Sequence, residues 1–451
     1  MSDPRIALCL TCKGRTPHVE QTLPKNLESN TDYQNAVFIV LNFNSADNLL
    51  MYLVTNHKPA MKSGRLVVYS FGGDGPFRMA FAKNLAHRCG MLEGADILVN
   101  LDADNLTGPG FASYIARQFT LYNKDEIFLW ARMIQGQLKR GVSGRIAMSS
   151  NSFVLAGGYD EKYDNWGPDD KDMNVRLQRL GRLPLEIESQ YLDAIHHKDK
   201  LRFKEYPHAR PAPGVGEDQF YLLNDATIAN FGNIGCGTVY RNFDPNPIEL
   251  KPLPTRIFGV GMHKTATTSL AKALNILGYD SAHWNSGAWA KAIYTEMTTT
   301  GRSKTLEKHY ALTDLPIAIL YRELDKAYPG SKFILTIRDE EKWLKSVRNH
   351  WSYDHNPFRW EWDVYPWASK MHKIVYGQKW FDPTVMLERY RRHNAEILSY
   401  FSGRPSDLLV LDMDLQPETL WASLCRFLAK PVPHGVSYPT EFATLVSKEF
   451  L

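Results

Sequence analysis

Two short segments carry residue types that handle phosphates and metal ions. In the first, residues 101–105 (LDADN), Asp102 and Asp104 directly follow an apolar run. Two carboxylates at this spacing can reach one Mg²⁺ or Mn²⁺ ion, or a metal-bound diphosphate, because hard cations prefer oxygen ligands. In the second, residues 259–270 (GVGMHKTATTSL), a small polar loop precedes a helical stretch. Such a loop offers a phosphate its backbone N–H groups and the positive end of a helix.

The loop at residues 261–266, here called the phosphate loop, departs from two common nucleotide-binding motifs. The ATPase form G-x-x-x-x-G-K-[ST] is absent, since Lys264 is followed by Thr265 without a preceding glycine. The dinucleotide-binding fingerprint would need a third glycine after Gly259 and Gly261. A small-molecule or nucleoside kinase therefore stays an alternative that the missing motif disfavours.

A second acidic cluster lies in the first half, at residues 169–172 (DDKD), just before the helical stretch 173–180. A helix N-terminus stabilises carboxylates, and one of them can take a proton from a hydroxyl group. Considered alone, the segment also fits a helix-capping acidic turn.

Apolar runs alternate with helical stretches in both halves, which indicates an α/β fold class. Strands are predicted at residues 5–10, 37–41, 66–69, 97–101, 256–260, 332–337 and 408–411, and helices at 80–90 and 267–277. Strand ends are where α/β sheets place ligands, so these elements would position both sites. The Pro-rich segment 242–254 predicts a boundary between domains 1–250 and 251–451.

Composition excludes several classes of protein. A net charge of +4 over 451 residues is too small to indicate a nucleic-acid partner, although it suits polyanionic donors. The five cysteines form no disulfide framework, and the Cys9–Cys12 pair lacks the second pair of a zinc site, so we expect it to be structural. Without a signal pattern or an 18-residue apolar run, we expect a cytoplasmic protein with no transmembrane segment. The oligomeric state is not indicated.

The order of motifs in the first half resembles inverting GT-A glycosyltransferases of the family-2 type. The matching segments are 10–15 (LTCKGR), 41–47 (LNFNSAD), 82–84 (AKN), 100–104 (NLDAD), 157–161 (GGYDE) and 166–170 (WGPDD). The last is similar to the acceptor-side motif of galactosyl- and N-acetylgalactosaminyltransferases, except that Asp169 stands where Glu is usual. The resemblance implies a Rossmann-like mixed sheet and metal-dependent transfer from a UDP-sugar to a glycan or glycolipid.

The same resemblance implies roles for individual residues. Asp170 would be the catalytic base, and Asp169 would bind the acceptor or the donor sugar. The nucleotide would be held by Thr11, Arg15 and Asp47, and Mn²⁺ or Mg²⁺ with the diphosphate by Asp102 and Asp104. His196 and His197 are two candidates for a late metal ligand, with a surface or structural role as the alternative.

The second half resembles sulfotransferases that use 3′-phosphoadenosine 5′-phosphosulfate (PAPS). Lys264 with Thr267 and Thr268 looks like their 5′-phosphosulfate loop, and Arg338 with Ser346 eight residues later matches their 3′-phosphate motif. For Arg338 alone, an ion pair with a neighbouring acid, Asp339 or Glu341, is the alternative. Segments 311–316 (ALTDLP) and 327–329 (AYP) are similar to one bacterial and eukaryotic branch of the family. The resemblance implies a P-loop-like α/β domain with a parallel sheet.

This second resemblance also implies residue roles. Lys264 would stabilise charge on the leaving group, with Asp314 as the first and His283 as the second candidate base. The PAPS phosphates would be bound by Lys264, Thr265, Ala266, Thr267, Thr268, Arg338 and Ser346. A late Arg-Lys-Gly segment, the third part of the family's 3′-phosphate site, is not evident. The aromatic stretch 351–367 could wall the acceptor or form a packed helical lid.

Together these features predict a bifunctional transferase of polysaccharide biosynthesis that adds a sugar and sulfates a hydroxyl, with fusion raising the effective concentration of any shared product. The alternative is a glycosyltransferase with a non-catalytic C-terminal module that binds nucleotides or other anions.

Overall fold

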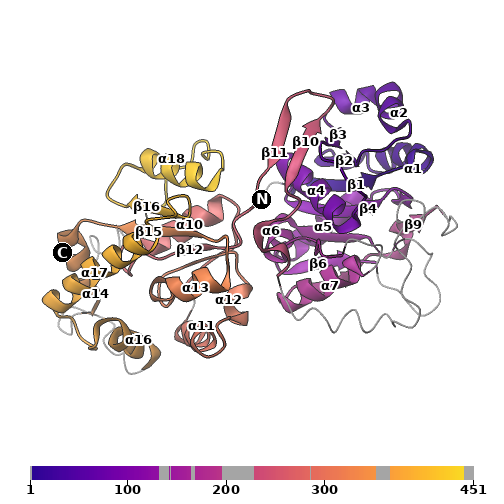
Figure 1. Cartoon of the computed structure of the whole chain (residues 1–451). Coiled ribbons are helices and arrows are strands. Elements are labelled where there is room, and N and C mark those ends of the chain that lie inside the picture. Colours follow the sequence, from indigo (N-terminus) through magenta and orange to yellow (C-terminus); the bar gives the residue numbers. More distant parts are fainter. Residues whose placement is uncertain are drawn as a thin grey trace. The chain divides into compact units, whose positions relative to one another are not determined.

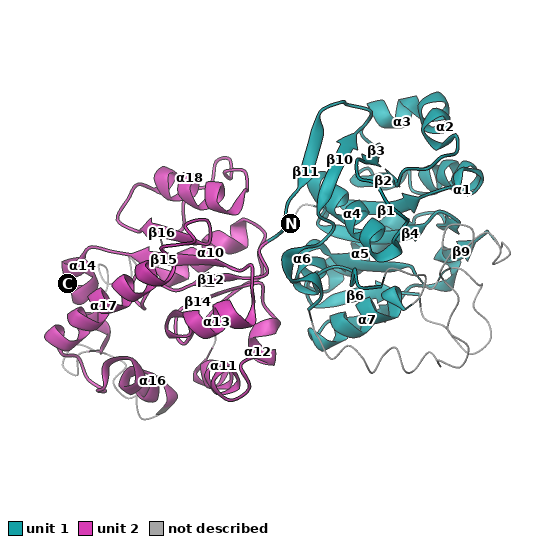
Figure 2. Ribbon diagram, viewed as in Figure 1, with its two compact units in different colours: residues 1–253 teal, residues 254–451 magenta. Residues whose placement is uncertain are grey.

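The computed structural model describes residues 3–131, 142, 144–163, 168–195, 228–284, 286–351 and 366–440. The chain divides into two compact units, Met1–Leu253 and Pro254–Leu451, compared with the division predicted after residue 250 (Figure 2). Each unit is described by itself below. No helix in the described part of the chain combines the length and the apolar character that crossing a membrane would demand.

The first unit contains a mixed sheet (Figure 1). Its strand order, within the described residues, is β11-β10-β3-β2-β1-β4-β7-β6-β8. The central strands β3, β2, β1 and β4 are parallel, whereas β10 and β7 run antiparallel to them. The strands are β1 (Ile6–Cys12), β2 (Ala36–Asn42), β3 (Leu66–Phe71), β4 (Ile97–Asp102), β6 (Ile127–Trp130), β7 (Ile146–Ser149), β8 (Leu183–Glu186), β10 (Gly237–Arg241) and β11 (Pro247–Leu250).

Helices and a small second sheet surround these strands. The helices are α1 (Thr16–Ser29), α2 (Leu49–Asn56), α3 (Lys58–Lys62), α4 (Met79–Leu92), α5 (Phe111–Leu121), α6 (Ser150–Leu155) and α7 (Asp169–Arg179), and β5 (Asn105–Leu106) pairs with β9 (Asp193–Ala194). Every residue of β1 and β2 is buried, as expected for parallel strands covered on both faces. Cys9 and Cys12 lie in β1, and burial raises the pKa of the Cys12 thiol to about 12, which fits a structural role.

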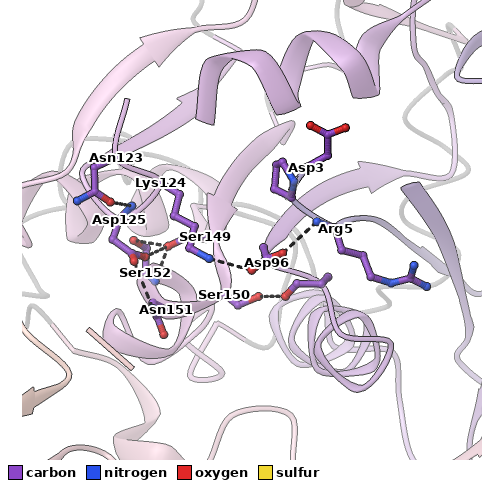
Figure 3. Close-up of polar contacts among 12 residues, drawn as sticks. Asp3, Arg5, Asp96, Asn123, Lys124, Asp125, Ser149, Ser150, Asn151 and Ser152 are labelled. Carbon is purple, nitrogen blue, oxygen red and sulfur yellow. Dashed lines mark hydrogen bonds and ion pairs between the residues drawn. The ribbon is translucent and has the colours of Figure 1, made fainter. Parts of the chain in front are cut away.

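A polar network fixes the edge of this sheet that lies away from Asp102 (Figure 3). The Asp96 carboxylate, just before β4, accepts hydrogen bonds from the Arg5 N–H at 3.0 Å and from Lys124 Nζ at 2.8 Å. The Asp125 carboxylate accepts one from the Ser149 hydroxyl, at the end of β7. The start of β4 and the end of β7 lie side by side because the two strands are antiparallel. The neighbouring residues Lys124 and Asp125 link them, one through Asp96 and the other through Ser149.

The second unit contains a parallel sheet with the strand order β13-β14-β12-β15-β16 among its described residues. Figure 1 shows α18 on one side of these strands and α13 on the other. The strands are β12 (Ile257–Gly259), β13 (Ser281–His283), β14 (Ala311–Thr313), β15 (Lys332–Ile337) and β16 (Leu408–Asp412). The helices are α10 (Thr267–Ile276), α11 (Gly287–Thr300), α12 (Lys304–Glu307), α13 (Tyr321–Ala327), α14 (Glu340–Trp351), α16 (Pro366–Tyr376), α17 (Pro383–Tyr400) and α18 (Pro417–Leu428).

The α/β fold class is therefore confirmed, with a mixed sheet in the first unit and a parallel sheet in the second. All seven predicted strands are present within one or two residues of their predicted ends, as are the helices predicted at 80–90 and 267–277. One boundary differs in a way that concerns the site, because α7 begins at Asp169 rather than after the acidic cluster.

Close packing, rather than dinucleotide binding, explains the two glycines before the phosphate loop. A Cβ atom on Gly259 would lie 2.7 Å from Thr313 Cγ2 on β14, and one on Gly261 would lie 1.9 Å from Thr336 Oγ1 on β15. Hence β12 and the loop can approach their neighbours only where no side chain is present.

Gly261→Ala should destabilise the second unit by about 1–3 kcal/mol, because the new methyl group would also meet the Thr336 carbonyl oxygen at 2.5 Å. Calorimetric melting of the full chain should show one transition moving to lower temperature. Gly403→Ala is the matched control, since its Cβ atom would have no neighbour within 4 Å. Equal melting of the two variants would contradict this account of the loop.

Candidate active sites of the two units

The carboxyl ends of the parallel strands in the first unit bring the predicted nucleotide-binding residues to one edge. Thr11 on β1 is the register partner of Asp102 on β4. Asp47 follows β2, and its carboxylate accepts a hydrogen bond from the Thr16 N–H at 3.0 Å, at the start of α1. Arg15 precedes that helix, and its buried Nη1 has no hydrogen-bond partner among the described residues. A guanidinium with an unused donor at this edge suits a phosphate or a carbonyl oxygen of a nucleotide.

Lys83, on α4, holds the two predicted acidic residues of the catalytic cluster. Its Nζ atom donates to Asp169 Oδ2 at 2.7 Å and to Asp170 Oδ1 at 2.6 Å, and its side chain is only 2% exposed. Burial alone would lower the pKa of Lys83, but Asp169, Asp170 and Asp102 together raise it well above its ordinary value. The lysine is therefore a fixed positive charge within an acidic site.

Asp170 titrates near neutral pH despite this partner. Burial is the largest influence and raises its pKa to about 7, with Asp169 and Asp102 adding to the rise and Lys83 opposing it. A general base works best when its pKa lies near the working pH. The environment of Asp170 thus suits the role of proton acceptor that the sequence predicts.

The second oxygen of Asp170 lies near Asp102, around a glycine that leaves space for both. A Cβ atom on Gly144 would lie 2.8 Å from Asp170 Oδ2 and 3.0 Å from Asp102 Oδ2. Asp170 therefore directs one oxygen to Lys83 and the other to the neighbourhood of Asp102. Asp102 thus offers a hard oxygen donor close to the oxygen of Asp170 that Lys83 leaves open, which fits a divalent cation beside the candidate base.

Asp104, the second acid of the predicted metal pair, has different surroundings. Its Oδ1 accepts a hydrogen bond from Asn105 Nδ2 at 3.0 Å, and its backbone oxygen accepts one from the Ile195 N–H at 2.8 Å. Arg145, which is fully buried close by, has its pKa lowered to about 10 by burial, an effect that Asp102, Asp104 and Asp193 oppose. The structure thus places the carboxylate of Asp102, but not visibly that of Asp104, beside Asp170.

The predicted histidine ligands, His196 and His197, lie outside the described residues, as do Trp166 and Gly167. Within the parts of the chain that are described, no three His, Cys, Asp or Glu side chains gather as a metal site. A surface pocket of about 370 Å³ also lies apart from the predicted site residues, between the end of α1 and the β5–β9 pair.

Sequence reasoning missed the roles of Lys83, Gly144 and Arg145. The segment 82–84 was matched as a motif, but no role was given to its lysine. One signal was available, because Lys83 directly follows the apolar run 80–82 in a helical stretch, and a lysine in such a place is buried only when it is paired. For Gly144 and Arg145 we find no signal in the sequence.

In the second unit, every strand of the parallel sheet delivers a polar group at its carboxyl end. His283 ends β13, Asp314 follows β14, the phosphate loop follows β12, Arg338 follows β15 and Asp414 lies just beyond β16. Carboxyl ends of parallel strands share one edge of a sheet, so the topology gathers these groups.

The backbone conformation of the phosphate loop depends on two left-handed residues and on one contact with α14. Lys264 and Ala266 have φ angles of 66° and 59°, in the left-handed region. The His263 carbonyl accepts a hydrogen bond from Trp343 Nε1 at 3.0 Å. Alternating conformations of this kind turn backbone N–H groups toward one side, which forms an anion-binding concavity.

Thr265 faces inward, whereas the sulfotransferase resemblance implies that it holds the 5′ phosphate. Its hydroxyl contacts the Met262 carbonyl and Thr336 Oγ1, both at 2.6 Å, and its N–H donates to the same carbonyl at 3.2 Å. With both donors used and the side chain fully buried, its part is to shape the loop.

The two candidate bases, His283 and Asp314, contact each other. His283 Nε2 lies 3.1 Å from Asp314 Oδ2, 3.1 Å from Thr267 Oγ1 and 3.2 Å from Thr268 Oγ1. Burial would raise the pKa of Asp314, but His283, the Leu315 N–H and Lys264 together lower it below its ordinary value. The pair therefore combines an ionised carboxylate with an imidazole beside the phosphate loop.

Lys264 and Arg338 lie within electrostatic reach of each other. Burial is the main cause that lowers the pKa of Lys264, Arg338 lowers it further, and Asp314 opposes both. Arg338 Nε lies 3.6 Å from Asp414 Oδ1, so its ion pair is with Asp414 rather than with Asp339 or Glu341. Ser346 is half-buried on α14.

Both ends of the aromatic stretch are packed into the second unit. The Trp351 ring lies 4.0 Å from the His263 ring, centroid to centroid. Trp367 is buried in an apolar cluster of the second unit, and Trp351 packs against that cluster. Residues 352–365 lie outside the described part, so the choice between an acceptor wall and a lid stays open.

Comparisons with known proteins agree with the chemistry of the second unit. Residues 256–443 match the family model described as a sulfotransferase domain. A relative from Aspergillus versicolor, Ava biosynthesis cluster protein M, is 24% identical over 214 residues, covering 40% of this chain and 77% of the relative. The sulfotransferase resemblance predicted for this unit is thereby confirmed.

Two solved structures of glycosyltransferases are more distant. The mannosyltransferase PcManGT from Pyrobaculum calidifontis, in complex with GDP-Man and Mn²⁺, is 15% identical with a TM-score of 0.36, covering 47% of this chain and 67% of that one. TarS residues 1–349 from S. aureus, in complex with UDP-GlcNAc, is 9% identical with a TM-score of 0.36, covering 46% of this chain and 62% of that one. The match of the second unit to a sulfotransferase domain supports a transferase.

Lys83→Met should destabilise the first unit by about 3–5 kcal/mol, because it leaves two acids buried without their cation. Lys124→Met is the control, since Lys124 and Asp96 form a pair at 2.8 Å whose side chains are 42% and 40% exposed. Such an exposed pair contributes about 1 kcal/mol or less. Urea denaturation of both variants checks this, and similar losses of stability would contradict a special role for Lys83.

Proposed function

We propose that the chain is a bifunctional transferase that moves a sulfuryl group from PAPS and a sugar from a UDP-sugar. The observation that carries the proposal is the gathering of Lys264, Arg338 and the His283–Asp314 pair at one edge of a parallel sheet. Two cations beside a proton-accepting pair are what transfer from a phosphosulfate to a hydroxyl requires.

In the second unit, the acceptor hydroxyl oxygen would attack the sulfur of PAPS in line with the leaving phosphate. The sulfur–oxygen bond to the 5′ phosphate breaks, and its electron pair leaves on 3′-phosphoadenosine 5′-phosphate (PAP). Lys264 would stabilise that developing charge, while backbone N–H groups of the loop and the N-terminus of α10 hold the 5′ phosphate. Arg338 and Ser346 would hold the 3′ phosphate.

The hydroxyl proton would pass to the His283–Asp314 pair. The lowered pKa of Asp314 makes its carboxylate a weak proton acceptor by itself. We therefore assign the acceptor role to His283 and a stabilising role to Asp314, which reverses the order expected from the sequence. Because Nε2 faces the ionised Asp314 carboxylate as well as the hydroxyls of Thr267 and Thr268, it would carry the imidazole proton, and Nδ1 of His283 would accept the proton of the hydroxyl.

In the first unit, Asp170 would take the proton of an acceptor hydroxyl as its oxygen attacks the anomeric carbon of the sugar. The bond from that carbon to the diphosphate breaks, and the electron pair leaves on UDP, with inversion. Asp102 faces the side of Asp170 that Lys83 leaves open, and with the predicted ligands Asp104, His196 and His197 it would hold Mn²⁺ or Mg²⁺. When bound, the metal supplies positive charge to the departing diphosphate.

A Gal- or GalNAc-type donor, a glycan or glycolipid acceptor and a place in polysaccharide biosynthesis are the finer parts of this proposal. The second candidate, a non-catalytic anion-binding C-terminal module, retains Lys264 and Arg338 but gives no role to the His283–Asp314 pair.

Lys264→Ala should lower the rate of sulfuryl transfer at least about 100-fold, because the variant lacks the ammonium group that stabilises negative charge on the leaving oxygen in the transition state. Transfer of ³⁵S from labelled PAPS across a panel of glycan acceptors measures this. Lys291→Ala, an exposed lysine on α11, should leave the rate unchanged. PAP binding without sulfuryl transfer by the unaltered protein would favour the non-catalytic module.

Sugar transfer should increase as the pH rises through about 7, because Asp170 must lose its proton to act as a base. Asp170→Asn should remove this step and lower the rate at least about 100-fold. The rate of UDP release from the donor, recorded from pH 5 to 9 with Mn²⁺, gives the profile, and sulfuryl transfer by the same sample is the internal control. Sugar transfer by Asp170→Asn at the wild-type rate would exclude Asp170 as the base.

A further inference from the structure

The charged groups around the start of α14 converge on one carboxylate. Asp414 Oδ2 accepts a hydrogen bond from the Asp339 N–H at 2.7 Å. Asp414 Oδ1 accepts one from Lys342 Nζ at 3.0 Å and lies 3.6 Å from Arg338 Nε. Two cations and the N–H that precedes a helix thus surround a single anion, as they would surround a phosphate group.

Lys342 lies close to both predicted 3′-phosphate ligands. On α14, which spans Glu340–Trp351, it comes four residues before Ser346, and residues four apart on a helix are neighbours on one face. Arg338 precedes the helix and shares the Asp414 carboxylate with Lys342. The lysine is thus placed between the two residues that the proposed function assigns to this phosphate.

Stability alone gives little reason for this arrangement. The Lys342 side chain is 58% exposed, and exposed ion pairs contribute about 1 kcal/mol or less. A carboxylate that contacts Arg338 would also compete with any phosphate that needs the same guanidinium. The contacts are better explained by a phosphate site that the Asp414 carboxylate occupies while the PAPS donor is absent.

We propose that Lys342 is a third ligand of the 3′ phosphate, and that Asp414 occupies this anion position until the donor displaces it. The inference rests on the proposed sulfotransferase function and deepens it. It supplies the cation that the absent Arg-Lys-Gly segment would otherwise provide. On binding, the phosphate oxygens would accept from Arg338, Lys342 and the Asp339 N–H, and the like charge of Asp414 would move away.

Calorimetric titration of the full chain tests the lysine with two ligands, PAP and AMP, which lacks the 3′ phosphate. Lys342→Met should weaken PAP binding about tenfold and leave AMP binding unchanged, since one charge-assisted hydrogen bond is lost. Lys345→Met, an exposed lysine on the same helix, should change neither affinity. Equal effects of Lys342→Met on both ligands, or no effect, would overturn the role of Lys342.

The same titration tests Asp414. Asp414→Asn should tighten PAP binding about fivefold with AMP unchanged, because a competing charge about 4 Å from the phosphate is removed. Asp325→Asn, which removes a charge paired with Arg404, is the control and should have no effect. Unchanged or weaker PAP binding by Asp414→Asn would overturn the displacement.

Wild-type protein separates this inference from the proposed function. If it binds PAP no better than AMP, the 3′-phosphate site itself fails, and with it the sulfotransferase proposal. If it prefers PAP while both variants behave like their controls, only the roles of Lys342 and Asp414 fail.

Discussion

Compensation of charge at the carboxyl ends of parallel strands is the constraint on which both candidate sites depend. In the first unit, the end of β4 delivers Asp102 and the start of α7 delivers Asp169 and Asp170, and the buried Lys83 offsets the latter two at 2.7 and 2.6 Å. In the second unit the strand ends deliver cations, and Asp314 and Asp414 offset Lys264 and Arg338. A buried charge without such a partner would cost several kcal/mol. Each site therefore pairs its buried acids or cations with a side chain of opposite charge. This built-in partner also sets how strongly each reactive group holds its proton.

Space is the second constraint, and glycines provide it at both sites. Gly144 leaves room for the carboxylates of Asp102 and Asp170, and Gly261 lets the phosphate loop approach β15. Both positions would place a Cβ atom within 3.0 Å of a functional or supporting side chain. Their role is therefore steric, and it is coupled to charge, because any side chain at Gly144 would separate the two acids whose proximity helps raise the pKa of Asp170.

The sequence predicts the fold better than it predicts the contacts. Buried apolar runs such as β1 and β15 depend on local composition, which explains why these strands were found at nearly their observed ends. The residues at strand ends, among them Asp102, Lys264 and Arg338, follow from the same reasoning, because α/β sheets place ligands there. Lys83, the Arg338–Asp414 pair and the inward turn of Thr265 could not be found this way, since each is a choice of partner between segments far apart in the chain. Spacing indicates which residues can be near a site, but only packing decides which of them contact one another.

The sign of the charge at each site explains how one chain could handle the two proposed nucleotide-type donors differently. On the proposed function, a UDP-sugar brings its diphosphate toward Asp102 and Asp170, while the nearest lysine is already engaged by two carboxylates. Besides Arg15, whose Nη1 has no hydrogen-bond partner among the described residues, an added cation would supply the attraction, which is the physical reason for a metal there. On the same proposal, the phosphates of PAPS would instead meet Lys264 and Arg338 directly, and they would displace an internal carboxylate rather than water. Binding at the second site would then be an exchange of one anion for another. Such an exchange would favour a doubly charged phosphate over a single carboxylate and so make the 3′ phosphate a determinant of donor choice.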